Sequence, residues 1–162
     1  MKTLLVTALV GGLVGAGAAP PAQDQIQIVP QTSRTSSPGA SNLFTGHAQV
    51  EQLFGARDQS RVTGGIVTFD PGARSAWHTH PVGQILIVTH GSGLVQQWGS
   101  TAHPMKAGDV VWIPANVKHW HGASASSSVT HIAIQESIDG KVVVDWLEPV
   151  TDEQYAAVNQ VH

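Results

Sequence analysis

Apolar and polar residues alternate over short runs along most of this chain, and clusters of Gly, Pro, Asp and Ser separate the runs. Period-two alternation in runs this short is typical of half-buried β-strands and not of helices. Short strands at even spacing favour an antiparallel barrel or sandwich. The predicted strands span residues 48–53, 61–69, 84–89, 94–98, 110–113, 129–135 and 142–146.

The first 19 residues differ from the rest of the chain. Lys2 is followed by an apolar run that ends in small residues, the pattern of a secretory signal peptide cleaved after Ala18 or Ala19. The alternative is an uncleaved membrane anchor, but the run is diluted with Gly and falls just short of the ~20 residues that span a bilayer. We therefore expect an exported, periplasmic or secreted protein with no stable membrane insertion after cleavage.

Three further segments follow the predicted signal peptide 1–19. Residues 20–42 are rich in Pro, Ser and Gln and predict a linker, with room for one short edge strand at 25–29. Residues 43–150 hold the barrel strands. In residues 151–162 we predict a helix and tail, because Thr151 and Gln154 have the spacing of a capping box and Val150 can pack on Tyr155.

Composition excludes several classes of function. Charged residues make up 12 % of the chain and the net charge is −3, so the clustered Lys and Arg of a nucleic-acid-binding surface are missing. The absence of Cys excludes disulfides, thiolate metal sites and cysteine nucleophiles. Nine His against eight Lys plus Arg is unusual and directs attention to metal binding.

The histidines come in pairs with the spacing of one strand face. His78 and His80 are two residues apart, as are His119 and His121, so the side chains of each pair point to the same face of an extended segment. Gln84 keeps the parity of the first pair if the chain stays extended between them. Two imidazoles on one buried face, with no carboxylate nearby in sequence, would be costly without a metal.

A further histidine, His131, lies among apolar residues in the run VTHIAIQ, with Gln135 on the same side. It is either an acid/base group or a buried strand histidine hydrogen-bonded to His121 or to backbone. Three imidazoles and an amide oxygen from these segments would form a mixed nitrogen and oxygen site for a divalent first-row metal.

Two segments that carry these residues resemble the two sequence motifs of the cupin family. They are GARSAWHTHPVGQILIVTHG and GDVVWIPANVKHWHG, with the motif positions Gly72, His78, His80, Gln84, Gly91, Gly108, Pro114, Asn116 and His119. The chain departs from the family pattern at Gln84, where the motif has Glu, and at Asn116, where it has Gly. Asn tolerates the left-handed backbone that Gly usually provides.

The segments AWHTHPVGQ, HWHGA and THIAIQE together resemble a narrower group of small bacterial single-domain cupins, over residues 42–158. This group includes manganese-dependent hydroxynitrile lyases and cupins associated with carboxymuconolactone decarboxylase-like proteins. The resemblance implies a single all-β jelly-roll (double-stranded β-helix) barrel with a short C-terminal helix, assembled as a dimer or tetramer. It implies the metal ligands His78, His80, Gln84 and His119, an acid/base His131 with His121 beside it, and Gln135 lining the pocket.

A neutral Gln in place of Glu leaves the charge of a divalent metal uncompensated, so the predicted site should attract anions and act as a Lewis acid. The resemblance favours manganese, with iron, zinc or nickel as alternatives. We expect a small-molecule substrate. Its specificity would come from inward-facing residues, for which the sequence suggests Gly65, Val67, Ile87 and Trp112.

Three hypotheses for the function remain open from the sequence. The first is a metal-dependent lyase of the hydroxynitrile-lyase type, which cleaves or forms cyanohydrins. The second is a different metalloenzyme on the same scaffold, an iron dioxygenase or an isomerase that acts on an anionic small molecule. The third is a non-catalytic exported module that binds a metal or a small ligand, since a fold alone does not determine chemistry.

Overall fold

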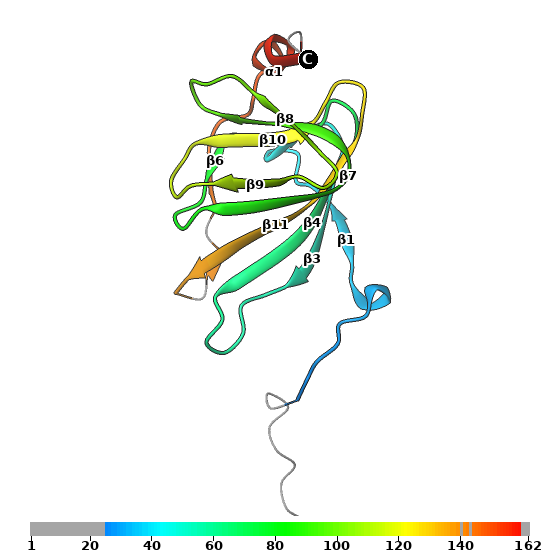
Figure 1. Cartoon of the computed structure of the whole chain (residues 1–162), viewed down its shortest axis with the longest axis vertical. Coiled ribbons are helices and arrows are strands. Elements are labelled where there is room, and N and C mark those ends of the chain that lie inside the picture. The colour runs from blue at the N-terminus through cyan, green and yellow to red at the C-terminus, as the bar shows by residue number, and fades with distance from the viewer. Residues whose placement is uncertain (1–24, 140, 143, 160–162) are drawn as a thin grey trace, which may run out of the picture.

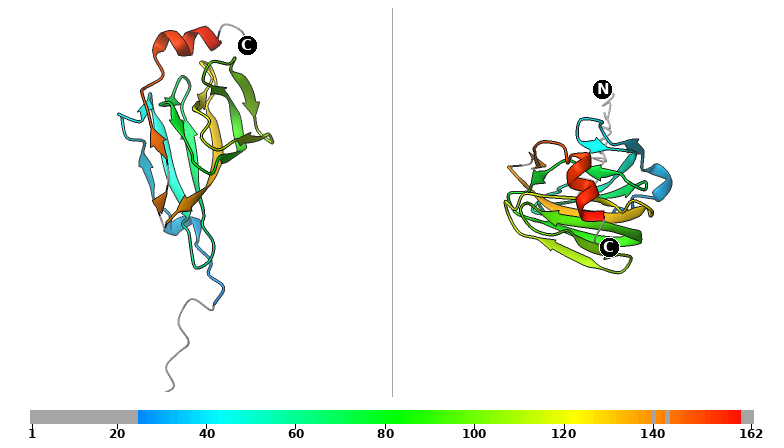
Figure 2. Two further views of the ribbon diagram at one scale, coloured as in Figure 1. Left: turned by 90° about the vertical axis from the view of Figure 1, so that its left-hand side faces the viewer. Right: turned by 90° about the horizontal axis from the view of Figure 1, so that it is seen from above.

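In the computed structural model, strands curl into a barrel, with helix α1 (Asp152–Asn159) across one end and the N-terminal segment leaving at the other (Figure 1). Seen from above, α1 lies over the open end of the barrel (Figure 2). The structure describes residues 25–139, 141–142 and 144–159. The predicted signal peptide 1–19, the first part of the linker and the last residues of the tail lie outside the described residues.

Strands hold about half of the described residues and the short helix α1 follows them, which confirms the predicted all-β barrel with a short C-terminal helix. A 3-10 turn at Gln31–Ser33 precedes the strands. The strands are β1 (Ser36–Pro38), β2 (Phe44–Thr45), β3 (Ala48–Phe54), β4 (Val62–Phe69), β5 (Arg74–Ser75), β6 (His78–Thr79), β7 (Gln84–Gln97), β8 (His103–Lys106), β9 (Val110–Ile113), β10 (His119–Ala123), β11 (Val129–Ile138), β12 (Lys141–Val142) and β13 (Asp145–Trp146).

The strands pair in the order β1-β3-β4-β11-β7-β10-β5-β2, and the pairs are antiparallel. Strand β7 joins the two halves of this curled sheet, because its first part pairs with β11 and β9 and its last part with β10 and β8. The two strands predicted at 84–89 and 94–98 are therefore one. The chain bends within it at Gly91, where φ is 68° and a Cβ would lie 1.9 Å from the carbonyl oxygen of Ser128.

Two other expectations about strands are wrong. Residues 25–29 form no strand, and Ile26 and Ile28 are 97 % and 85 % exposed; the edge position beside β3 is taken by β1. The strand predicted at 142–146 divides into β12, which pairs with β11, and β13, which pairs with β6. Neighbouring strands decide these cases, because a short apolar run becomes a strand only where a partner offers hydrogen bonds.

The interior of the barrel has an apolar part and a polar part. The apolar core includes Phe69, Leu86, Val88, Met105 and Val129, all at most 2 % exposed. On β11 the buried positions Val129, His131 and Ala133 follow one another in two-residue steps, so the inner face of this strand carries apolar residues and a histidine together. The polar part of the interior holds the histidines.

Helix α1 forms within the predicted range and lies over one end of the barrel. The main-chain N–H of Gln154 donates to Oγ1 of Thr151 (3.2 Å), and the main-chain N–H of Thr151 donates to Oε1 of Gln154 (3.0 Å), which confirms the capping box. Val150 and Tyr155 pack in one buried cluster with Trp120. Among the described residues, no helix is long and apolar enough to cross a membrane.

Candidate metal centre and cavity

Two strands and one turn bring the first group of histidines together. His78 lies in β6 directly opposite His119 in β10, because the two residues are register partners. His80 follows in the turn that leads into β7. One ring nitrogen from each of His78, His80 and His119 lies within 4.8 Å of the others, and all three residues are buried. This is a separation that one metal ion can bridge.

Hydrogen bonds to backbone carbonyls fix which nitrogen of two rings faces this centre. Nδ1 of His78 lies 2.9 Å from the carbonyl oxygen of Ala76, and Nδ1 of His119 lies 2.8 Å from that of Val117. A carbonyl only accepts hydrogen bonds, so each Nδ1 must carry the proton. Each Nε2 is then left with a free lone pair, as in histidines that bind metals through Nε2.

Gln84, the first residue of β7, completes the group. Its Oε1 lies 3.3 Å from Nε2 of His119. Because the proton of His119 is on Nδ1, the lone pairs of His119 Nε2 and Gln84 Oε1 face each other at this contact. The two atoms repel each other unless a cation lies between them, and both could bind that cation. The chain does not stay extended before Gln84, because Gly83 has φ of 89°. The glycine turn nevertheless brings Gln84 inward, and it is 4 % exposed.

Burial keeps the histidines of this centre in the form that binds metals. Desolvation, followed by the charge of His119, holds the pKa of His78 well below its usual 6.5, and desolvation also lowers the pKa of His119. These two rings are therefore neutral at neutral pH, which metal ligation requires. Three imidazoles and an amide oxygen suit several divalent first-row metals.

A second pair of histidines lies beside the centre. His121 in β10 and His131 in β11 approach each other so that Nε2 of His131 lies 3.1 Å from Nδ1 of His121. Both side chains are buried, and Nδ1 of His131 has no hydrogen-bond partner among the described residues. Burial, followed by the charge of His131, lowers the pKa of His121 well below 6.5, and burial lowers the pKa of His131 to about 4. Both rings are neutral at pH 7.

A cavity of about 150 Å³ opens next to the first group and reaches His121. Its space comes from small residues, because Gly65 in β4 and Ala133 in β11 are register partners on the inner face of the sheet. The rest of the wall is mostly apolar. The lining residues are Phe44, Val50, Gly65, Val67, His78, His80, Gln84, His121, Ala133, Gln135, Val144 and Trp146.

Known proteins place this chain in a family. A cupin-domain family model matches residues 65–134. An (R)-mandelonitrile lyase from Granulicella tundricola is 53 % identical over 123 residues, which cover 76 % of this chain and 93 % of the relative. The chain is a cupin. This relative is a lyase, and the alignment covers almost all of it.

Solved structures agree with this cupin assignment. A cupin-like protein from Thermotoga maritima has a TM-score of 0.71 and 42 % identity, with 78 % of this chain and 95 % of that chain covered. A polyketide cyclase from Streptomyces resistomycificus has a TM-score of 0.60 and 15 % identity, with 81 % and 91 % covered. The second likeness shows the fold alone.

Asn116 has φ of 61°, so it adopts the left-handed backbone at the motif position that usually holds Gly.

The fold of this cupin brings together most of the residues that the sequence singled out. His78, His80, Gln84 and His119 meet at one centre, and Gly65, Val67 and Gln135 line the cavity as expected of pocket residues. His131 touches His121 but does not line the cavity and is 0 % exposed, so His121 is the member of the pair that faces the cavity.

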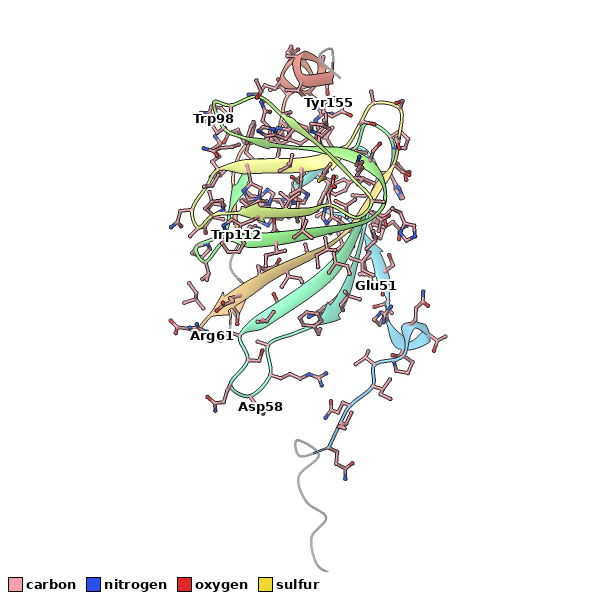
Figure 3. All side chains as sticks on the ribbon, in the orientation of Figure 1. Glu51, Asp58, Arg61, Trp98, Trp112 and Tyr155 are labelled. Carbon is pink, nitrogen blue, oxygen red and sulfur yellow. The ribbon has the colours of Figure 1, made fainter. Side chains whose placement is uncertain are left out.

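Ile87 and Trp112 do not face inward, contrary to the sequence prediction. In β7 the buried residues are Gln84, Leu86 and Val88, so Ile87 has the opposite parity and lies on the outer face. Trp112 in β9 pairs with Ile85, also an outer-face residue, and is 62 % exposed (Figure 3). Because paired residues share a face of the sheet, the register of β9 against β7 turns Trp112 to the outside.

The sequence prediction missed the aromatic wall of the cavity. Trp146 in β13 is the register partner of His78, with ring centroids 4.8 Å apart, and Phe44 in β2 packs against Trp146 at 5.7 Å. Trp146 ends a predicted strand, so its presence in the barrel was foreseeable. Phe44 follows the linker in a two-residue strand, and no local pattern places it beside residues a hundred positions later.

Proposed function

We propose that this cupin is a metal-dependent lyase of the hydroxynitrile-lyase type, which cleaves a cyanohydrin to hydrogen cyanide and a carbonyl compound. The observation that carries the proposal is the pair of neutral, hydrogen-bonded histidines beside a centre of three histidines and a glutamine, with His121 of the pair facing a mostly apolar cavity. The 53 % identity to an (R)-mandelonitrile lyase over nearly its full length supports the same activity.

In this proposal His78, His80, Gln84 and His119 hold a divalent metal, with manganese as the first candidate. When bound, the ion supplies uncompensated positive charge beside the cavity, which favours negative charge on the oxygen of the substrate. The apolar walls, including Phe44 and Trp146, hold the organic part of the substrate and exclude water.

The His121–His131 pair handles the proton of the reaction. Cleavage needs a base for the hydroxyl proton and an acid for the departing cyanide. The proton leaves the hydroxyl for the ring of His121, the carbonyl forms, and the C–C bond to the nitrile breaks with its electron pair on cyanide. His121 then transfers this proton to cyanide, and hydrogen cyanide leaves. No oxidant or reductant is required.

The hydrogen bond inside the pair suits both directions of proton transfer. A ring nitrogen of neutral histidine is a donor or an acceptor according to the tautomer. When Nδ1 of His121 donates to Nε2 of His131, the other nitrogen of His121 is an acceptor; when the bond reverses, it is a donor. His131 therefore positions His121 and sets its tautomer without touching the substrate.

The test combines metal analysis with a cleavage assay on the purified protein. We expect stoichiometric manganese and metal-dependent release of benzaldehyde and cyanide from mandelonitrile. Bound metal without cyanide release contradicts the lyase, and oxygen consumption with a bound iron would favour a dioxygenase. Folded protein that binds no divalent metal contradicts the whole site.

Variants separate the proposed roles. His78→Ala should lose the metal and with it the activity. His131→Ala should keep the metal but lose cleavage by about 100-fold or more, the usual range for removing acid–base help. His103→Ala, at an exposed position of β8, is the matched control and should change neither property. Loss of metal in the His131 variant would contradict its assignment as the residue that positions His121.

A further inference from the structure

Gln84 poses a problem of orientation that a glutamate would not. A side-chain amide has an oxygen on one branch and an NH₂ group on the other, and only the oxygen binds a metal. A turned amide would place its NH₂ against the lone pair of His119 Nε2, where it would donate a hydrogen bond and block the centre. The site therefore needs a group that holds the NH₂ branch away from the histidines.

A series of hydrogen bonds across three neighbouring strands holds the NH₂ branch of Gln84 away from the histidines. Thr63 in β4, Gln135 in β11 and Gln84 in β7 are successive register partners across the sheet. Nε2 of Gln84 donates to Oε1 of Gln135 (3.4 Å), and Nε2 of Gln135 donates to Oγ1 of Thr63 (3.0 Å). Oγ1 of Thr63 donates in turn to the main-chain oxygen of Gln135 (3.1 Å).

The end of this series fixes the direction of every bond in it. The main-chain oxygen of Gln135 can only accept, so the proton of the Thr63 hydroxyl is committed to it. The hydroxyl oxygen must then accept from Gln135, which turns the NH₂ of Gln135 toward Thr63 and its oxygen toward Gln84. That oxygen accepts from the NH₂ of Gln84, and Oε1 of Gln84 is left facing His119.

We propose that Thr63 is a positioning residue that orients the amide of Gln84 for metal binding, acting through Gln135. Thr63 is 4 % exposed, lies behind the ligands and is absent from the lining of the cavity. The proposal rests on the metal centre of the proposed function but not on the reaction. It explains how a neutral amide serves at a position where a carboxylate, with two equivalent oxygens, needs no such orientation.

A double-mutant cycle read by metal affinity tests the proposal. The dissociation constant for Mn²⁺ is measured by competition with a fluorescent chelator in wild type, Thr63→Val, Gln84→Glu and the double variant. Thr63→Val keeps the shape of the side chain and removes the hydroxyl, and we expect about tenfold weaker binding, the lower end for loss of an outer partner of a ligand. In the Gln84→Glu background the same change should cost about twofold or less, because either carboxylate oxygen can bind.

Two controls separate positioning from general loss of structure. Thr68→Val is a matched variant on the same strand, where the hydroxyl bonds Thr130 at 3.0 Å and not the site, and Mn²⁺ affinity should not change. Thr63→Ser restores the hydroxyl and should restore affinity. If Thr63→Val does not fold, Gln135→Leu removes the same orienting bonds and carries the same expectations.

The outcomes are distinguishable. Equal losses in the Gln84 and Gln84→Glu backgrounds, or no loss in either, overturn the role of Thr63 and leave the metal centre intact. Failure of the folded wild type to bind Mn²⁺ overturns the metal centre, and with it both proposals. Normal Mn²⁺ binding without mandelonitrile cleavage overturns only the reaction.

Discussion

Acid should destabilise the metal-free protein through its buried histidines, and His131 allows the effect to be isolated. Burial lowers the pKa of His131 from 6.5 to about 4 in the folded state. In the unfolded chain His131 therefore becomes protonated near pH 6.5, whereas in the folded protein it becomes protonated only near pH 4. The contribution of His131 to stability is complete above this window and is lost as the pH falls through it.

The size of the effect follows from the width of the window. Each pH unit within it costs about 1.4 kcal/mol for one histidine. Acidification from about pH 7 to about pH 5 should therefore remove about 2 kcal/mol through His131 alone, a large share of the ~5–15 kcal/mol of a typical domain. The pKa values of His78, His119 and His121 are lowered too, so the wild type should lose more than this.

Urea unfolding followed by tryptophan fluorescence, with a chelator present, measures the free energy of unfolding at each pH. His131→Gln keeps a polar side chain that does not titrate, and each protein is compared with its own value at neutral pH. We expect the variant to lose about 2 kcal/mol less than the wild type over this range. His103→Gln, an exposed control, should behave as the wild type. An equal loss in wild type and His131→Gln would refute the reasoning.

Two predictions concern the scaffold and are read by the same unfolding assay at neutral pH. Gly91→Ala should prevent folding or cost several kcal/mol, because its Cβ would lie 1.9 Å from the carbonyl oxygen of Ser128 at a φ of 68°; a loss below about 1 kcal/mol would contradict this bend of β7. Arg74→Met should cost about 2–3 kcal/mol, because the buried guanidinium donates to the carbonyl of Val150 and to Asp152 and so joins α1 to the barrel. Unchanged stability would mean that α1 stays on the barrel without the hydrogen bonds of Arg74.

Local patterns in the sequence were sufficient where the structure depends on neighbours along the chain. The strand 110–113 has its predicted bounds, and the capping box of Thr151 and Gln154 forms as expected. The parity of His78 and His80, and of His119 and His121, correctly placed each pair on one face of an extended segment. These features follow from the two-residue period of a strand and the geometry of a helix start, which a few residues determine.

Features that depend on which strands pair, and in which register, were decided by the tertiary structure. The two-residue period of a strand shows which residues of the same strand share a face with Ile87 or with Trp112, but it does not show whether that face is the inner one. Shifting a strand by one residue would exchange its two faces, and only the global register excludes this.

The same limit applies to the site. Thr63 and Gln135 are 72 residues apart in sequence and become partners only because β4 pairs with β11. Trp146 reaches His78 only through β13. The sequence by itself determined the types and spacing of the candidate ligands, and the family. The register of the closed sheet determined which side chains line the cavity, which histidine faces it, and which hydroxyl stands behind the glutamine, because those contacts join residues that no local pattern connects.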